Sequence, residues 1–224
     1  MKFGLHYLLS CADGESPTAL YRETIEQAVC AESFGFESVW PVEYHLNREV
    51  SVLPSPALLL AAIAERTRTA HVNPLPKLRD LVPRYREARA AAGHVSTAND
   101  LTLLMPMYVA ESRRAVEADV ARSVDQFART SATVVATWVA RAPAAERPAL
   151  EALLARAHAL SYETVNAVSG IFDTPDACVG RLRRLREELR PARVICWFNF
   201  GGLVPHERVM RSVALFAERV MPDV

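Results

Sequence analysis

The stretch ESVWPVEYHLNRE, residues 37–49, changes character halfway along its length. Its first half is apolar and centred on Trp40, and a cluster of titratable side chains begins at Glu43. The residues before it end a predicted helix, with Gly35 at the usual stop position. A short apolar strand that ends in polar groups is typical of parallel α/β proteins, whose functional groups lie at the carboxyl ends of the strands. The stretch therefore predicts both a fold class and the position of a site.

Length and composition narrow the class of protein. A chain of 224 residues fits one sizeable domain, so we expect residues 1–224 to form a single α/β unit. No run approaches the roughly 20 apolar residues of a membrane span, and no secretory leader is evident. The 26 basic and 26 acidic residues balance, so no global field favours nucleic acid. We expect a cytoplasmic protein with no membrane or nucleic-acid partner.

The four cysteines lie far apart in the sequence and none forms a C-x-x-C pair. This spacing argues against metal ligation and against a disulfide framework. We expect buried free thiols at Cys11, Cys30, Cys178 and Cys196.

Strands and helices are predicted to alternate, which implies parallel pairing and right-handed crossovers. The predicted strands are 2–9, 37–43, 69–75, 101–109 and 193–200. The predicted helices are 17–34 after the N-cap Ser16, 56–67, 80–92, two or three within the glycine-free segment 111–168, one opened by Thr174 and Pro175, and 205–220. About five strands are too few for an eight-stranded barrel.

Segments at both ends of the chain carry a family resemblance. They are 1–5, 31–36, 38–45 and 56–69 near the start, and 108–112, 173–175, 198–202 and 212–222 near the end. Together they resemble the bacterial luciferase-like, flavin-dependent monooxygenases. The resemblance implies a TIM-barrel-derived fold, here an incomplete or open parallel β/α barrel with extra helices. It also implies insertion of one oxygen atom from O2 into a small organic substrate by reduced flavin, either FMN or F420, supplied by a flavin reductase as partner.

Two departures from the family pattern bear on function. A block that in the family supplies about three strands and much of the flavin phosphate site is absent near residues 76–80. No Gly-rich loop replaces it, so use of no flavin at all stays open. The second departure is Tyr44, which stands where many members carry the first histidine of Glu-His-His. Tyrosine, with a pKa of about 10, is a poorer proton acceptor than histidine at neutral pH.

We assign the catalytic role to His45 and Tyr44, although neighbouring strand residues usually face opposite sides. The alternative for His45 is a structural histidine at the strand end. Further candidates for cofactor binding or pocket lining are His6, Glu43, Asn73, Asn199, Gly201 and Gly202. The structural alternative for Glu43 is pairing with a neighbouring basic residue. For the last three residues it is a turn required by backbone geometry.

Two hypotheses of different class remain. The first is an enzyme of the luciferase-like kind, and the second is a non-catalytic descendant that binds a hydrophobic ligand or a partner protein. An unclosed sheet would expose strand edges, which we expect between 69–75 and 101–109. The helices of 111–168, with Trp138 and the Val134–Val135 pair, are the available cover. They either fold back over the opening or pack on a second copy, and we expect a homodimer.

Overall fold

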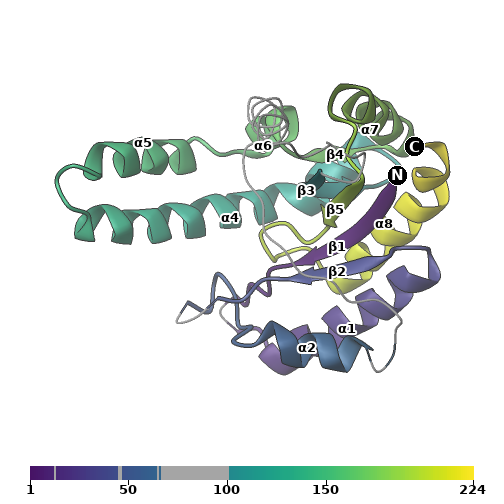
Figure 1. Cartoon of the computed structure of the whole chain (residues 1–224), viewed down its shortest axis with the longest axis horizontal. Helices are drawn as coiled ribbons and strands as arrows, with labels where there is room; N and C mark the ends of the chain where they lie inside the picture. Colours follow the sequence, from purple (N-terminus) through teal and green to yellow (C-terminus); the bar gives the residue numbers. More distant parts are fainter. Residues whose placement is uncertain (13, 45–46, 65, 67–100) are drawn as a thin grey trace, which may run out of the picture.

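The computed structural model describes residues 1–12, 14–44, 47–64, 66 and 101–224. Its described strands form one parallel sheet in the order β2-β1-β5-β3-β4 (Figure 1). The strands are β1 (Lys2–Tyr7), β2 (Ser38–Pro41), β3 (Thr102–Val109), β4 (Ile171–Asp173) and β5 (Arg193–Trp197). The sheet is open in the described part of the chain, with β2 and β4 at its edges. The predicted α/β class with an unclosed parallel sheet is confirmed.

The described helices surround this sheet, and most begin where the sequence predicts. They are α1 (Pro17–Ser33), α2 (Pro56–Ala64), α4 (Arg113–Arg141), α5 (Arg147–His158), α6 (Tyr162–Val168), α7 (Pro175–Leu189) and α8 (His206–Arg219), followed by the short 3₁₀ helix η1 (Met221–Asp223). The hydroxyl of Ser16 caps α1 by accepting from the Ala19 N–H at 3.4 Å. The predicted strand 69–75 and helix 80–92 lie outside the described residues.

β4 was not predicted, and it changes where the sheet ends. Its three residues pair with the second half of β3, so β3 lies between β4 and β5. The expectation that segment 101–109 would be an edge strand is therefore wrong. A three-residue strand between two helices gives too short a pattern for periodicity to detect.

The two faces of the sheet carry different aromatic clusters. On the face covered by α1 and α8, Phe3 lies 5.1 Å from Phe216 between ring centroids, and Phe36 and Phe198 complete the group. Trp197, next to Phe198 along β5, contacts a different group that includes His6 at 4.6 Å. Since successive strand residues face opposite sides, His6 and Trp197 lie on the face opposite Phe3.

The long helix α4 connects the sheet to the rest of the predicted helical segment. Its first half packs on the strands through a buried stripe that includes Val116, Val120 and Val124. Its second half runs beyond the sheet and pairs with α5 to form a projecting helical hairpin (Figure 1). Three helices within 111–168 confirm the prediction for that segment.

Candidate functional site

A cavity of about 170 Å³ lies at the carboxyl ends of β1, β2 and β5, and we call it the Trp138 cavity. One side is formed by the segments that follow the three strands, and the other side is formed by α4. The α4 residues recur at helical spacing, which places them on one face of that helix. The described lining residues are Leu8, Ser10, Tyr44, Glu49, Val50, Phe127, Thr130, Ser131, Val134, Val135, Trp138 and Gly201.

The loop after β2 is fixed against β1 by backbone and side-chain hydrogen bonds. The Val42 N–H donates to the Tyr7 carbonyl at 2.9 Å, and the Val52 N–H donates to the Leu9 carbonyl at 2.8 Å. The hydroxyl of Ser10 donates to the Val50 carbonyl at 3.0 Å. These bonds hold the polar stretch after β2 over the end of β1, which forms one wall of the cavity.

The turn after β5 requires glycine at two successive positions. Gly201 and Gly202 have φ values of +88° and +87°, in the left-handed region that favours glycine. A side chain on Gly201 would lie 1.7 Å from the Ser123 carbonyl oxygen, and one on Gly202 would lie 2.6 Å from the Ser10 Cβ. Asn199 stabilises the same turn, because its Oδ1 accepts from the Val204 N–H at 3.0 Å. Backbone geometry thus explains all three residues, although Gly201 also lines the cavity.

Ser123 of α4 holds this turn and was not predicted. Its hydroxyl donates to the Phe200 carbonyl at 2.6 Å and accepts from the Leu203 N–H at 2.9 Å. The residue is fully buried, at a position between Val120 and Val124 in the helix stripe. A serine beside such a stripe is the signal that sequence analysis could have used, since buried hydroxyls need partners.

The structure brings together only part of the predicted site. Tyr44 is half-buried in the cavity wall, and its N–H donates to the Leu53 carbonyl at 3.2 Å. Glu43 is exposed and does not line the cavity. His45 and Asn73 lie outside the described residues. The cavity residues of α4, Phe127 to Trp138, were predicted only as cover for the sheet.

His6 lies behind the cavity rather than in its lining. It is buried, and burial lowers the pKa of its imidazole from 6.5 to about 3, so the ring is neutral at physiological pH. Its neighbour Trp197 contacts Phe127 at 5.5 Å and Phe200 at 4.7 Å. Among the described residues, the buried indole Nε1 of Trp197 has no hydrogen-bond partner. His6 thus packs against Trp197 and is not among the described lining residues of the cavity.

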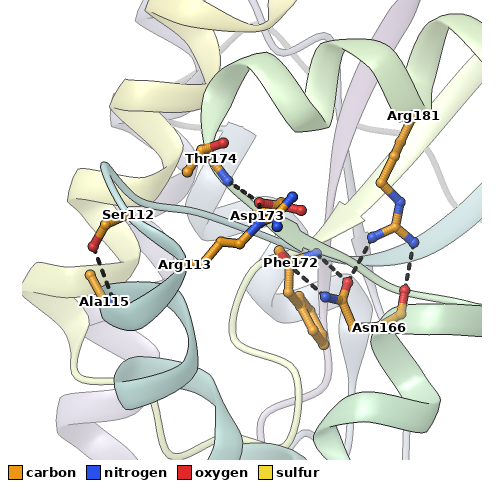
Figure 2. A network of polar contacts seen from close by, with 8 residues as sticks. All are labelled: Ser112, Arg113, Ala115, Asn166, Phe172, Asp173, Thr174 and Arg181. Carbon is orange, nitrogen blue, oxygen red and sulfur yellow. Dashed lines mark hydrogen bonds and ion pairs between the residues drawn. The ribbon is translucent and has the colours of Figure 1, made fainter.

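A second polar cluster lies at the carboxyl end of β4 (Figure 2). The buried carboxylate of Asp173 accepts from Arg113 Nε and from the Thr174 N–H, both at 2.9 Å. The same carboxylate oxygen, Oδ1, accepts both bonds. They join the end of β4 to the starts of α4 and α7. We assign Asp173 a structural role.

A larger groove, of about 600 Å³, borders β4. Unlike the Trp138 cavity, it does not lie at the carboxyl ends of the strands. Its lining includes Ile171, which begins β4, and Arg181, Arg184 and Glu188 from the middle and the end of α7. In a parallel α/β protein the helix that follows a strand runs antiparallel to it, so α7 ends near the amino ends of the strands. The groove therefore lies away from the carboxyl ends, where sites form in such proteins. The Trp138 cavity is therefore the better candidate.

The described cysteines are all free of disulfides. Cys11, Cys178 and Cys196 are buried, and Cys30 is half-buried. Burial raises the pKa of the Cys178 thiol to about 12, so this sulfur stays protonated.

In the described part of the chain, no helix is both long and apolar enough to cross a membrane.

Comparison with known proteins shows the fold and a resemblance of the first third of the chain to one family. Residues 1–73 match the model of the luciferase-like monooxygenase family. The chain is 40% identical over 59 residues to the uncharacterized protein y4vJ of Sinorhizobium fredii, a match that spans 26% of this chain and 16% of that relative. The chain thus matches about a sixth of that relative's length.

Two solved structures share the fold over almost the whole chain. The monooxygenase RslO1 from Streptomyces bottropensis superposes with a TM-score of 0.70 at 15% identity, covering 99% of both chains. The oxygenating constituent of 3,6-diketocamphane monooxygenase from Pseudomonas putida, solved in complex with FMN, also gives 0.70, at 13% identity, covering 100% of this chain and 99% of that one. These two structures show the fold, and the sequence match shows that residues 1–73 resemble the luciferase-like monooxygenase family.

Proposed function

We propose that the chain is a luciferase-like, flavin-dependent monooxygenase homologue that holds a small organic substrate in the Trp138 cavity. The observation that carries the proposal is the position of this cavity, at the carboxyl ends of β1, β2 and β5 in a chain whose first 73 residues match that family. Reaction with O2 would require reduced flavin from a separate flavin reductase.

The described cavity does not fit a whole flavin nucleotide. Its volume of about 170 Å³ is below the roughly 300–1,000 Å³ of pockets for drug-sized ligands. A flavin phosphate needs cationic or backbone donors, whereas Glu49 is the one charged residue among the described lining residues. This argument applies equally to FMN and to the phosphate of F420, so no chemical step is assigned to a flavin held in this cavity.

The residues of the cavity are suited to binding and orienting a substrate. Phe127 and Trp138 give apolar contact area and help to exclude water. Tyr44 lies in the cavity wall, and its hydroxyl can donate a hydrogen bond to a substrate oxygen. Tyr44 would orient the substrate, and we propose that the adjacent His45 supplies the acid–base group.

A second candidate function is a non-catalytic descendant that binds a hydrophobic ligand or a partner protein. The lack of a cationic residue in the described cavity lining favours it, because a flavin would then lack its usual anchor. The two candidates share the ligand cavity and differ in flavin chemistry.

One measurement separates the candidates. The purified protein is mixed with FMN, passed through gel filtration and examined by absorbance, and oxygen uptake is then followed with chemically reduced FMN and candidate substrates. Substrate-dependent oxygen uptake above the flavin-only rate supports the enzyme. Equal rates with and without protein across substrates that bind would overturn the enzyme proposal and favour the binding protein.

A further inference from the structure

The size of the Trp138 cavity limits the ligand to about one ring. An apolar cavity of about 150 Å³ is large enough to bind benzene. The Trp138 cavity, at about 170 Å³, is only slightly larger. We propose that it binds a neutral molecule with a single six-membered ring, and that Trp138 sets this size limit. The inference deepens the proposed function by naming the substrate class, and it rests on that function only for calling the ligand a substrate.

The chemistry of the wall favours an apolar ring with one polar substituent. Leu8, Val50, Val134 and Val135 supply aliphatic surface, and Phe127 supplies an aromatic ring. Such surfaces stabilise a buried ring chiefly by removing apolar area from water.

Few polar groups of the wall are available to a ligand. The hydroxyl proton of Ser10 is donated to the Val50 carbonyl, and Thr130 Oγ1 accepts from Gln126 Nε2 at 3.4 Å. The hydroxyls of Tyr44 and Ser131, both residues of the wall, can bond to an oxygen of the ligand. A single alcohol or carbonyl oxygen on the ring would satisfy one of these groups.

The charge of the cavity argues against anionic ligands. Glu49 is exposed, and it is the one charged residue among the described lining residues. A carboxylate on the ligand would lose hydration without gaining a cationic partner, and it would be repelled by Glu49. The ligand is therefore neutral.

Trp138 is placed to act as a wall that can be removed without unfolding the protein. Its side chain is 48% exposed, so it stands at the mouth of the cavity and outside the buried core. It belongs to the second half of α4, the part of that helix that pairs with α5 and projects from the sheet (Figure 1). Phe127, by contrast, packs against the core, so its truncation would also cost stability.

The test measures binding to the full chain without flavin, by ligand-observed NMR and calorimetry. The probes are benzyl alcohol, benzoate and 1-naphthalenemethanol. We expect benzyl alcohol to bind at least tenfold more tightly than either other probe. In Trp138→Ala we expect 1-naphthalenemethanol to bind at least tenfold more tightly than in the wild type. Leu58→Ala, a change at an exposed leucine of α2, is the matched control and should leave all three affinities unchanged.

Several outcomes would overturn the inference. They are equal binding of benzyl alcohol and 1-naphthalenemethanol to the wild type, binding of benzoate as tight as that of benzyl alcohol, no gain for the larger probe in Trp138→Ala, or no binding of any probe. A chain that binds benzyl alcohol selectively but takes up no oxygen with reduced FMN would contradict the proposed enzyme function alone. The two failures are thus distinguishable.

Discussion

The side-chain amide of Asn166 pairs with the backbone of Phe172 as a neighbouring strand would. The Phe172 N–H donates to Asn166 Oδ1 at 2.9 Å, and Asn166 Nδ2 donates to the Phe172 carbonyl at 3.0 Å. Arg181 extends the contact by donating to Asn166 Oδ1 at 2.7 Å and to the Asn166 carbonyl at 2.6 Å (Figure 2). It also donates to the Gly170 carbonyl. Phe172 belongs to the edge strand β4, so this amide satisfies backbone groups that would otherwise be open to another strand.

We expect Asn166→Ala to lower the free energy of unfolding by about 1–3 kcal/mol, because it leaves two strand-edge groups and part of Arg181 without partners. Chemical denaturation measures this. Val168→Ala, on the same helix at an 83% exposed position, is the control and should change stability by less than about 0.5 kcal/mol. Equal effects of the two changes would show that the amide does not protect the edge.

Burial of His6 predicts a loss of stability in acid. The unfolded chain takes up a proton near pH 6.5, whereas the folded imidazole does so only at about pH 3. The stabilisation is therefore complete above pH 6.5 and falls as the pH is lowered towards 3, by up to about 1.4 kcal/mol per pH unit.

Replacement by an apolar ring should remove this contribution. We expect His6→Phe to flatten the dependence of unfolding free energy on pH between 6.5 and 3, with exposed His158→Gln as the control. Unfolding by urea at a series of pH values checks it. If His6→Phe keeps the wild-type slope while His158→Gln loses it, the assignment to His6 is wrong.

The sequence predicted the elements whose physical cause is local. Strong apolar runs and clear caps, such as Ser16 before α1, located most strands and helices to within a few residues. β4 was not predicted, because its position depends on pairing with β3 and on the hydrogen bonds of Asn166. Neither interaction produces a periodic pattern of apolar residues in the sequence. The wall formed by α4 was missed for a related reason. Residues 127–138 look like ordinary core spacing, and only the path of the helix brings them over the strand ends.

We predict weak flavin binding, with a dissociation constant in the micromolar range or poorer, which corresponds to roughly 8 kcal/mol or less. The reasons are the phosphate-binding block that the family resemblance implies is missing and the lack of a cation among the described lining residues of the cavity. Quenching of FMN fluorescence on titration with protein measures it, and riboflavin, which lacks the phosphate, is the matched ligand control. A nanomolar constant for FMN with much weaker binding of riboflavin would contradict the prediction.

If the chain is catalytic, Tyr44→Phe and His45→Ala should each lower turnover while the melting temperature changes little. A general acid–base group contributes about a hundred- to ten-thousand-fold, and we expect the larger loss at His45. Turnover is measured as substrate-dependent oxygen uptake with reduced FMN, and stability by thermal unfolding. Full activity combined with reduced stability in both variants would mean that the cluster is structural.

We propose that two copies associate through the hairpin of α4 and α5. The hairpin projects from the sheet, and it carries Trp138 at 48% and Leu153 at 38% exposure (Figure 1). Asn166 already occupies the outward backbone groups of Phe172 at the β4 edge, so we base this proposal on the exposed apolar side chains of the hairpin. Symmetric pairs are the commonest assembly of soluble proteins.

Light scattering at micromolar concentration should therefore give twice the chain mass of 24.8 kDa, and Leu153→Glu should halve the measured mass. Leu58→Glu, at a 74% exposed leucine of α2, is the matched control and should leave the dimer intact. A wild-type mass of one chain would rule the dimer out, and the fold-back of these helices over the sheet would then be the remaining cover.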